Sequence, residues 1–146
     1  MGVSTPRGPR ACATVWMAAR AGDTEKCQQL LAARAEVDVR LKSWTPLMGA
    51  AELGHAGVVS LLLENKANVN AANKKGRSAL SFAVCPSNDG GTRRESQIPV
   101  MQHLLSHGAD VCRKDVRGRT VLEQALIEGR AKVADSLRAA QKWQTP

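Results

Sequence analysis

One segment of this 146-residue chain is more informative than any other: Thr45-Pro46-Leu47-Met48-Gly49-Ala50-Ala51-Glu52-Leu53-Gly54-His55, continuing through Val58-Val59 and Leu61-Leu62 to Ala67-Asn68-Val69-Asn70-Ala71. The small pair Ala50 and Ala51 allows two helices to approach closely. Gly54 ends a helical run, where a left-handed residue without a Cβ atom is favoured. Because the apolar residues from Val58 to Leu62 follow at helical spacing, the segment predicts two short helices joined by a turn.

The same pattern recurs along the chain with a measurable period. Ser78-Ala79-Leu80 stands 33 residues after Thr45-Pro46-Leu47, and Thr120-Val121-Leu122 follows after 42 more, which is one period plus nine. On the N-terminal side, residues 18–22 match residues 50–54, so a first unit starts near Ala13 and its linker to the second is one residue short. A fixed period of this length indicates stacked structural repeats.

The segment resembles one ankyrin repeat, whose pattern is Thr-Pro-Leu-His-x-Ala-Ala-x-x-Gly-His, then Val-Val-x-x-Leu-Leu, then Gly-Ala-Asp-Val-Asn-Ala. The resemblance implies an all-α ankyrin-repeat solenoid of about four helix-turn-helix repeats with short β-hairpin fingers. No such unit can bury its own apolar face, so stacking of neighbours builds the core. The histidine of the Thr-Pro-Leu-His pattern is absent from every unit, and its place is taken by Trp16, Met48, Ser81 and Glu123.

These features divide the chain into a repeat domain with two short ends. Residues 1–12 are rich in Pro, Gly, Ser and Arg and lack an apolar segment, so we expect a disordered basic arm without a secretory leader. The repeat domain spans residues 13–140. Its units are expected at 13–44, at 45–77, at 78–119 with an insertion near 85–97, and at 120–140 as a polar capping repeat, followed by a tail at 141–146.

Composition and motifs argue against catalysis and against a membrane span. No apolar run reaches the roughly 18 residues of a membrane helix. The four cysteines fit no paired metal-ligand spacing, and we find neither a Gly-rich phosphate loop nor a His-Glu-x-x-His pattern. We therefore expect no enzyme activity, cofactor, metal or small-molecule substrate. Reduced thiols suit an intracellular protein, cytoplasmic or nuclear, while the acid-poor, Arg-bearing start leaves an organelle open.

The net charge of +8 is concentrated in the linkers between the units. The resemblance implies that these linkers, residues 39–44, 71–77 and 113–119, form fingers beside a concave face. They hold nine cations against one acid, Asp115, while the rest of the chain carries 12 basic and 12 acidic groups. The nine cations are Arg40, Lys42, Lys74, Lys75, Arg77, Arg113, Lys114, Arg117 and Arg119. The charge pattern favours an anionic partner, although a merely solvated surface remains the alternative.

From the resemblance we expect a non-catalytic protein-interaction module, an adaptor, scaffold or complex subunit that binds an acidic protein partner through these fingers and the concave face. Trp44 is either an exposed contact residue or packed on its own hairpin. Phe82 is expected on the concave floor. By family position the floor comprises Met17, Arg20, Gly49, Glu52, Leu53, Phe82 and Gln124.

Three further hypotheses remain. The same basic rim could bind nucleic acid or another anionic surface, which would make the affinity fall steeply with salt. The chain could also be a structural subunit whose open face is buried in a complex. Finally, Arg93-Arg94-Glu95-Ser96 resembles the basic-basic-x-Ser site of basophilic kinases, which makes Ser96 a candidate for phosphorylation beside the start of a helix.

Overall fold

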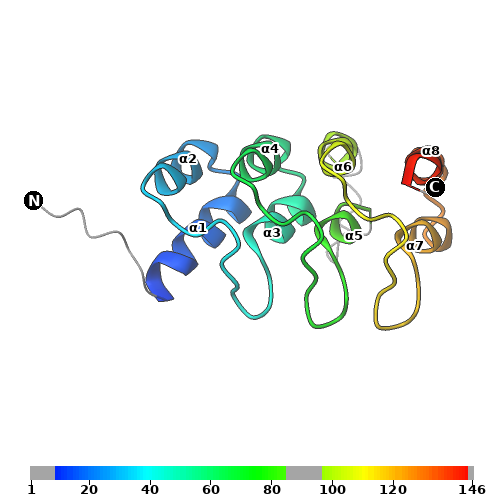
Figure 1. Ribbon diagram of the computed structural model, residues 1–146, viewed down its shortest axis with the longest axis horizontal. Helices are drawn as coiled ribbons and strands as arrows, with labels where there is room; N and C mark the ends of the chain where they lie inside the picture. Colours follow the sequence, from blue (N-terminus) through cyan, green and yellow to red (C-terminus); the bar gives the residue numbers. More distant parts are fainter. Residues whose placement is uncertain (1–8, 85–96, 145–146) are drawn as a thin grey trace, which may run out of the picture.

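The computed structural model of the chain describes residues 9–84 and 97–144, and within them the chain forms helices and loops (Figure 1). The helices of these residues are α1 Pro9–Ala21, α2 Thr24–Ala32, α3 Pro46–Leu53, α4 Ala56–Glu64, α5 Ala79–Val84, α6 Gln97–Ser106, α7 Val121–Ile127 and α8 Ala131–Gln144. None of them is both long and apolar enough to cross a membrane.

The helices form two rows. In Figure 1 the inner row contains α1, α3, α5 and α7, and the outer row contains α2, α4, α6 and α8. Each helix of the inner row packs against the next, and each inner helix forms a packed pair with the outer helix that follows it in the chain. The predicted all-α repeat solenoid is therefore confirmed.

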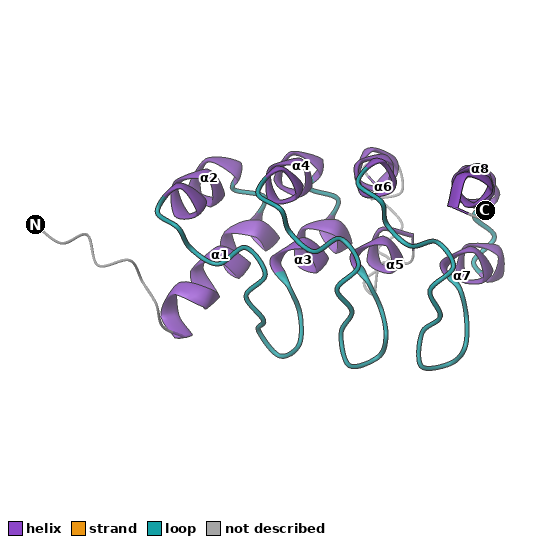
Figure 2. Ribbon diagram, viewed as in Figure 1, coloured by secondary structure: helices purple, strands orange, loops and turns teal. Residues whose placement is uncertain are grey.

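The loops that join one pair to the next project away from the outer row (Figure 2). Each is closed by one isolated antiparallel bridge: Leu41 with Trp44, Ala72 with Ser78, and Lys114 with Thr120. No β-strand forms in the described residues, so the expected β-hairpins are reduced to single bridges. The loops are short, and each re-enters a helix directly after its bridge, so no further residue pairs can extend the bridge into a strand ladder. We call these loops the first, second and third finger loops (residues 39–44, 71–77 and 113–119).

The helix ends follow from local sequence. The Thr45 hydroxyl accepts a hydrogen bond from the Met48 N–H at 3.3 Å, and Pro46 occupies the first turn, where a missing N–H costs nothing. Thr120 and Glu123 form a complete capping box at α7. The prediction that Gly54 ends a helical run in the left-handed region is confirmed, with φ of 76°, and Gly22, Gly108 and Gly129 adopt the same conformation, with φ between 68° and 84°.

Small residues form the contact surface between repeats. Helix α3 is buried from Pro46 to Glu52, because α1 and α5 flank it and α4 covers it. Ala50 and Ala51 are both fully buried there. Cys27 also belongs to the core, since its side chain is fully buried. Burial raises the pKa of the Cys27 thiol, and the nearby Asp23 charge adds to this, so the thiol stays protonated and inert.

Polar bonds between neighbouring repeats supplement this packing. The His55 imidazole lies against Gly22 and its Nε2 donates to the Arg20 carbonyl at 3.0 Å. Further along the solenoid, Asp38 accepts from the Asn68 N–H, and Asn70 accepts from the Asp110 N–H at 2.7 Å. These bonds satisfy backbone groups in the loops that leave the outer helices, so each loop is held by its neighbour.

The two ends of the repeat domain differ from the expected boundaries. Helix α1 begins at Pro9, inside the segment 1–12 that was expected to be disordered, and α8 continues to Gln144, beyond residue 140. Proline is well suited to a first helical position, and the sequence 139–144 contains good helix formers, which explains both extensions. In the fourth pair Arg138 is exposed and lies 3.7 Å from Asp135, whereas Leu137 is fully buried.

The contact between His55 and Gly22 yields a stability prediction. A Cβ atom on Gly22 would lie 2.7 Å from the His55 ring, whereas one on Gly108 would meet nothing within 4 Å. Both glycines have positive φ, so alanine costs about 1–2 kcal/mol of backbone strain at either site. We expect Gly22→Ala to lower the free energy of unfolding by clearly more than Gly108→Ala, measured by urea denaturation. Equal losses would mean that the imidazole moves aside without cost.

Candidate functional site

The three finger loops are linked into one edge of the solenoid. The Arg40 guanidinium of the first loop donates to the Ala72 carbonyl of the second at 3.0 Å. The Val116 N–H of the third loop donates to the Lys75 carbonyl of the second at 3.1 Å. A Cβ atom on Gly76 would come within 3.1 Å of the Asp115 backbone, so the second and third loops are in backbone contact. The basic residues therefore occupy a continuous surface.

The first finger loop makes a tighter turn than the others. Leu41 and Trp44 exchange two backbone hydrogen bonds of 2.9 Å, leaving only Lys42 and Ser43 between them. Both turn residues have positive φ, 49° and 70°, as a two-residue hairpin requires. Neither is glycine, asparagine or aspartate, the usual residues there, so the turn is strained. This is the structural consequence of the linker that is one residue short.

The second and third finger loops share a different design. The Asn73 side chain accepts from the N–H groups of Lys75 and Arg77, at 2.9 and 3.0 Å. Asp115 does the same for Arg117 and Arg119, at 2.8 and 3.0 Å. Each loop then places a glycine in the left-handed region, Gly76 or Gly118. One polar side chain thus closes each of these two turns.

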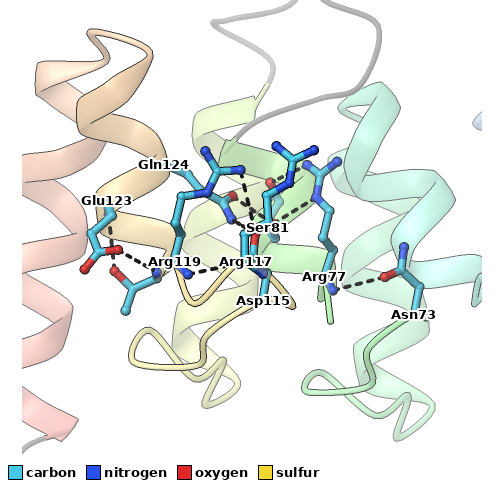
Figure 3. A network of polar contacts seen from close by, with 9 residues as sticks. Asn73, Arg77, Ser81, Asp115, Arg117, Arg119, Glu123 and Gln124 are labelled. Carbon is cyan, nitrogen blue, oxygen red and sulfur yellow. Dashed lines mark hydrogen bonds and ion pairs between the residues drawn. The ribbon is translucent and has the colours of Figure 1, made fainter. Parts of the chain in front are cut away.

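Asp115 is also the centre of a polar network that joins two repeats (Figure 3). Its second oxygen accepts from the Gln124 amide at 3.0 Å and lies 3.9 Å from the Arg119 guanidinium. Gln124 in turn accepts from the Ser81 hydroxyl at 3.0 Å. Burial alone would raise the pKa of the Asp115 carboxyl. The N–H groups and positive charges of Arg119 and Arg117 outweigh that effect and hold this pKa below its ordinary value.

The nine finger cations fall into two groups. Four arginines are engaged within the protein: Arg40 and Arg113 donate to backbone carbonyls, Arg119 pairs with Asp115, and Arg77 donates to Ser81. The remaining five are exposed, and their side chains make no hydrogen bond or ion pair within the described residues. These five are Lys42, Lys74, Lys75, Lys114 and Arg117.

Two aromatic side chains, Trp44 of the first finger loop and Phe82 of α5, are in contact. The Trp44 and Phe82 ring centroids lie 4.3 Å apart with a tilt of 36°, and the Arg77 guanidinium carbon lies 4.2 Å from the Phe82 centroid. Phe82, expected on the concave floor, is only 1% exposed, so neighbouring residues cover most of its ring. Trp44 is half-buried, and its ring packs on Phe82 of α5.

The other residues expected on the concave floor differ in their exposure. Met17 is 62% exposed, whereas Glu52 and Gln124 are buried. The Glu52 carboxylate lies 3.6 Å from the Arg20 guanidinium, which also covers the Trp16 ring. Glu52 and Gln124 are buried between stacked repeats, where side chains of neighbouring repeats supply their polar partners. No three His, Cys, Asp or Glu side chains of the described residues gather where they could hold a metal ion.

A pocket of about 260 Å³ opens between the first and second finger loops. Its lining consists of Lys42, Ser43, Trp44, Asn73, Lys74, Lys75, Arg77 and Phe82. Sequence analysis included six of these residues and missed Ser43 and Asn73. The one-residue deletion was the available signal for Ser43, and the Asn-Lys-Lys-Gly turn sequence was the signal for Asn73. Ser96 lies outside the described residues and stays a prediction.

Comparison with known proteins adds independent evidence. A family model described as ankyrin repeats (3 copies) matches residues 15–115. The chain is 39% identical over 89 residues to the E3 ubiquitin-protein ligase XBAT33 of Arabidopsis thaliana, covering 60% of this chain and 16% of that protein. It is 38% identical over 95 residues to YahD of Escherichia coli, named as an ankyrin repeat protein, covering 64% and 45%. It is 37% identical over 118 residues to the probable E3 ubiquitin-protein ligase XBOS33 of rice, covering 77% and 21%. The chain thus spans less than half the length of each of these relatives.

The strained first turn yields a prediction. Glycine adopts positive φ without steric cost, so Ser43→Gly should raise the free energy of unfolding by about 1 kcal/mol. The exposed helical residue Ser136 is the matched control, and there the same change should lower stability by about 1 kcal/mol. Urea denaturation of both variants measures the difference. A loss of stability in Ser43→Gly would show that the hydroxyl contributes more than the strain costs.

The lowered pKa of Asp115 yields a second prediction. A carboxyl whose pKa is lower in the folded state stabilises the fold above its unfolded pKa of about 3.9 and loses this effect as pH falls through the folded value. Asp115→Asn keeps an oxygen for the turn, as Asn73 does, but removes the charge. We therefore expect wild type to be more stable than Asp115→Asn at pH 7, with a difference that shrinks toward pH 3. A difference independent of pH would contradict an electrostatic role.

Proposed function

The chain belongs to the ankyrin-repeat family, and from that premise we propose that it is a non-catalytic adaptor, scaffold or complex subunit that binds an acidic protein partner through its finger loops. Ankyrin repeats are generally protein-interaction modules, which supports the class of function. From the plant relatives we carry over only the repeat architecture, because the matching region is less than a quarter of each ligase.

The observation that carries this proposal is the group of five exposed finger cations whose side chains make no hydrogen bond or ion pair within the described residues. Their positive charges lie on one continuous edge, and the single acid among the finger loops, Asp115, is committed to turn N–H groups, Gln124 and Arg119. Like charges gathered in this way repel one another, and an anionic surface would relieve that repulsion. Because the five side chains are exposed, their contribution would be mainly to association rate and specificity.

The arginines that form hydrogen bonds within the protein contribute to this proposal by fixing the finger loops. Arg40 and Arg113 each bridge to a backbone carbonyl of a neighbouring repeat, at 3.0 and 2.9 Å. They therefore hold the finger loops in place rather than offering free charges. A surface fixed in this way loses less conformational entropy on binding.

Nucleic acid is the second candidate, since the same edge would attract phosphates. Single-stranded binding uses aromatic rings on which bases stack. Trp44 is the one aromatic residue of the three finger loops, and its ring already stacks on Phe82. The finger loops therefore favour a protein partner over single-stranded nucleic acid.

Charge reversal tests the proposal. We expect Lys74→Glu combined with Lys75→Glu to weaken retention of partners from a native extract by about tenfold or more, since each exposed pair lost is worth up to about 1 kcal/mol and repulsion adds to this. The matched control is Lys132→Glu with Lys142→Glu, two exposed lysines of α8 in the opposite row. It should retain partners as wild type does.

The same experiment separates the two candidates. Retention that survives nuclease treatment and falls with salt supports a protein partner. If nuclease abolishes it, and duplex DNA binds with a log–log salt slope of about −0.9 per phosphate contact, the nucleic-acid function is correct instead. Equal retention by wild type and by the Lys74 and Lys75 reversal would refute the finger-loop proposal.

A further inference from the structure

The pocket between the first and second finger loops has a composition that specifies its occupant. Its lining contains Lys42 from one loop and Lys74 and Lys75 from the other, together with the Trp44 and Phe82 rings and the Arg77 side chain. Every ionisable lining group is cationic, and the three lysine side chains make no hydrogen bond or ion pair within the described residues. The lysines are exposed, whereas Phe82 is buried. The pocket therefore combines exposed positive charge with a less exposed aromatic surface.

The size of the pocket limits the class of ligand. Its volume of about 260 Å³ lies below the range of about 300–1,000 Å³ that is typical of small-molecule sites. A volume of this size suits one or two side chains of a longer ligand. The finger loops follow one another along one edge of the solenoid (Figure 1), so a longer polypeptide bound there would continue along that edge.

The conformation of the first turn supports a binding role independently of the charges. Lys42 and Ser43, both lining residues, are held at positive φ although neither is a glycine. Backbone strain of this kind persists where the surroundings over-determine it, and it concentrates at ligand clamps. The other two finger loops avoid such strain by placing Gly76 and Gly118 at their left-handed positions. Among the three finger loops, this strain is therefore confined to the first turn, and outside them Arg34 and Lys66 also have positive φ.

We propose that this pocket binds an acidic segment of a protein partner, with a Glu or Asp carboxylate between Lys42 and the Lys74–Lys75 pair and an adjacent aliphatic side chain against Trp44. This inference rests on the proposed function and names the ligand at one point of the finger-loop surface. Ammonium groups are point charges that accept a carboxylate without bidentate geometry. The only guanidinium of the pocket, on Arg77, is already engaged with Ser81 and Phe82.

Labelled synthetic peptides test this proposal by fluorescence anisotropy. The probe contains Glu-Glu-Leu-Glu-Glu between Gly-Ser spacers. One comparison peptide replaces every Glu with Gln, a second replaces Leu with Ser, and a third carries phosphoserine in place of the central Glu residues. We expect the probe to bind, and the Gln and Ser peptides to bind about tenfold more weakly. Tighter binding of the phosphoserine peptide than of the probe would overturn the choice of a carboxylate.

Protein variants locate the binding site. Lys42→Gln and Lys74→Gln should each weaken probe binding several-fold, whereas Lys114→Gln should not. Lys114 is the matched control because it is an exposed lysine on the third finger loop, outside the pocket, and its side chain makes no hydrogen bond or ion pair with any residue that the structure describes. Equal weakening by all three variants would refute the pocket while leaving a general basic surface intact.

A spectroscopic readout avoids variants that may disturb folding. The Trp44 indole N–H signal, assigned in a nuclear magnetic resonance spectrum by its loss in Trp44→Phe, should shift on titration with the probe and not with the Ser-for-Leu peptide. An unchanged Trp44 signal at saturating probe would overturn the proposal. If no peptide binds but retention of native partners still depends on Lys74 and Lys75, the pocket inference fails and the proposed function stands.

Discussion

Every feature of this protein depends on the close approach of neighbouring helix pairs. No pair can bury its apolar face alone, so the core exists only between pairs. Ala50 and Ala51 make that approach possible, and Gly22 extends it by leaving room for the His55 ring of the next repeat. A single added methyl group at such a position affects the stacking, whereas the same group at Gly108 meets empty space.

Stacking at a fixed spacing also creates the edge on which the finger loops lie. Because adjacent loops are only one repeat apart, side chains from one reach the backbone of the next. Arg40 and Arg113 use this reach to hold neighbouring carbonyls, and Asp115 links its own turn to α7 through Gln124. Four of the five finger arginines and the one finger acid thereby hold the loops in place. The finger lysines and Arg117 are exposed, and their side chains make no hydrogen bond or ion pair in the part of the chain that the structure describes.

The pocket arises from an irregularity in this regular arrangement. The first linker is one residue shorter than the others, so its turn contains only Lys42 and Ser43. The second loop has the extra residue and a glycine at the corresponding turn. Two loops of different shape placed side by side leave a space between them, and the Trp44 and Phe82 rings line it. The difference in shape between the first and second finger loops would be absent if both linkers had the same length and turn.

The sequence alone determined the repeat period, the helical class, the glycine helix ends and the position of the excess charge, because each depends on local spacing or on composition. Tertiary structure decided which charges remain available. Arg40 and Arg113 meet carbonyls 32 and 43 residues away, at Ala72 and Asn70, and Phe82 is covered by residues of the adjoining loops. These contacts depend on how the repeats stack in space, so they cannot be predicted from the type of a residue or from its neighbours in the sequence.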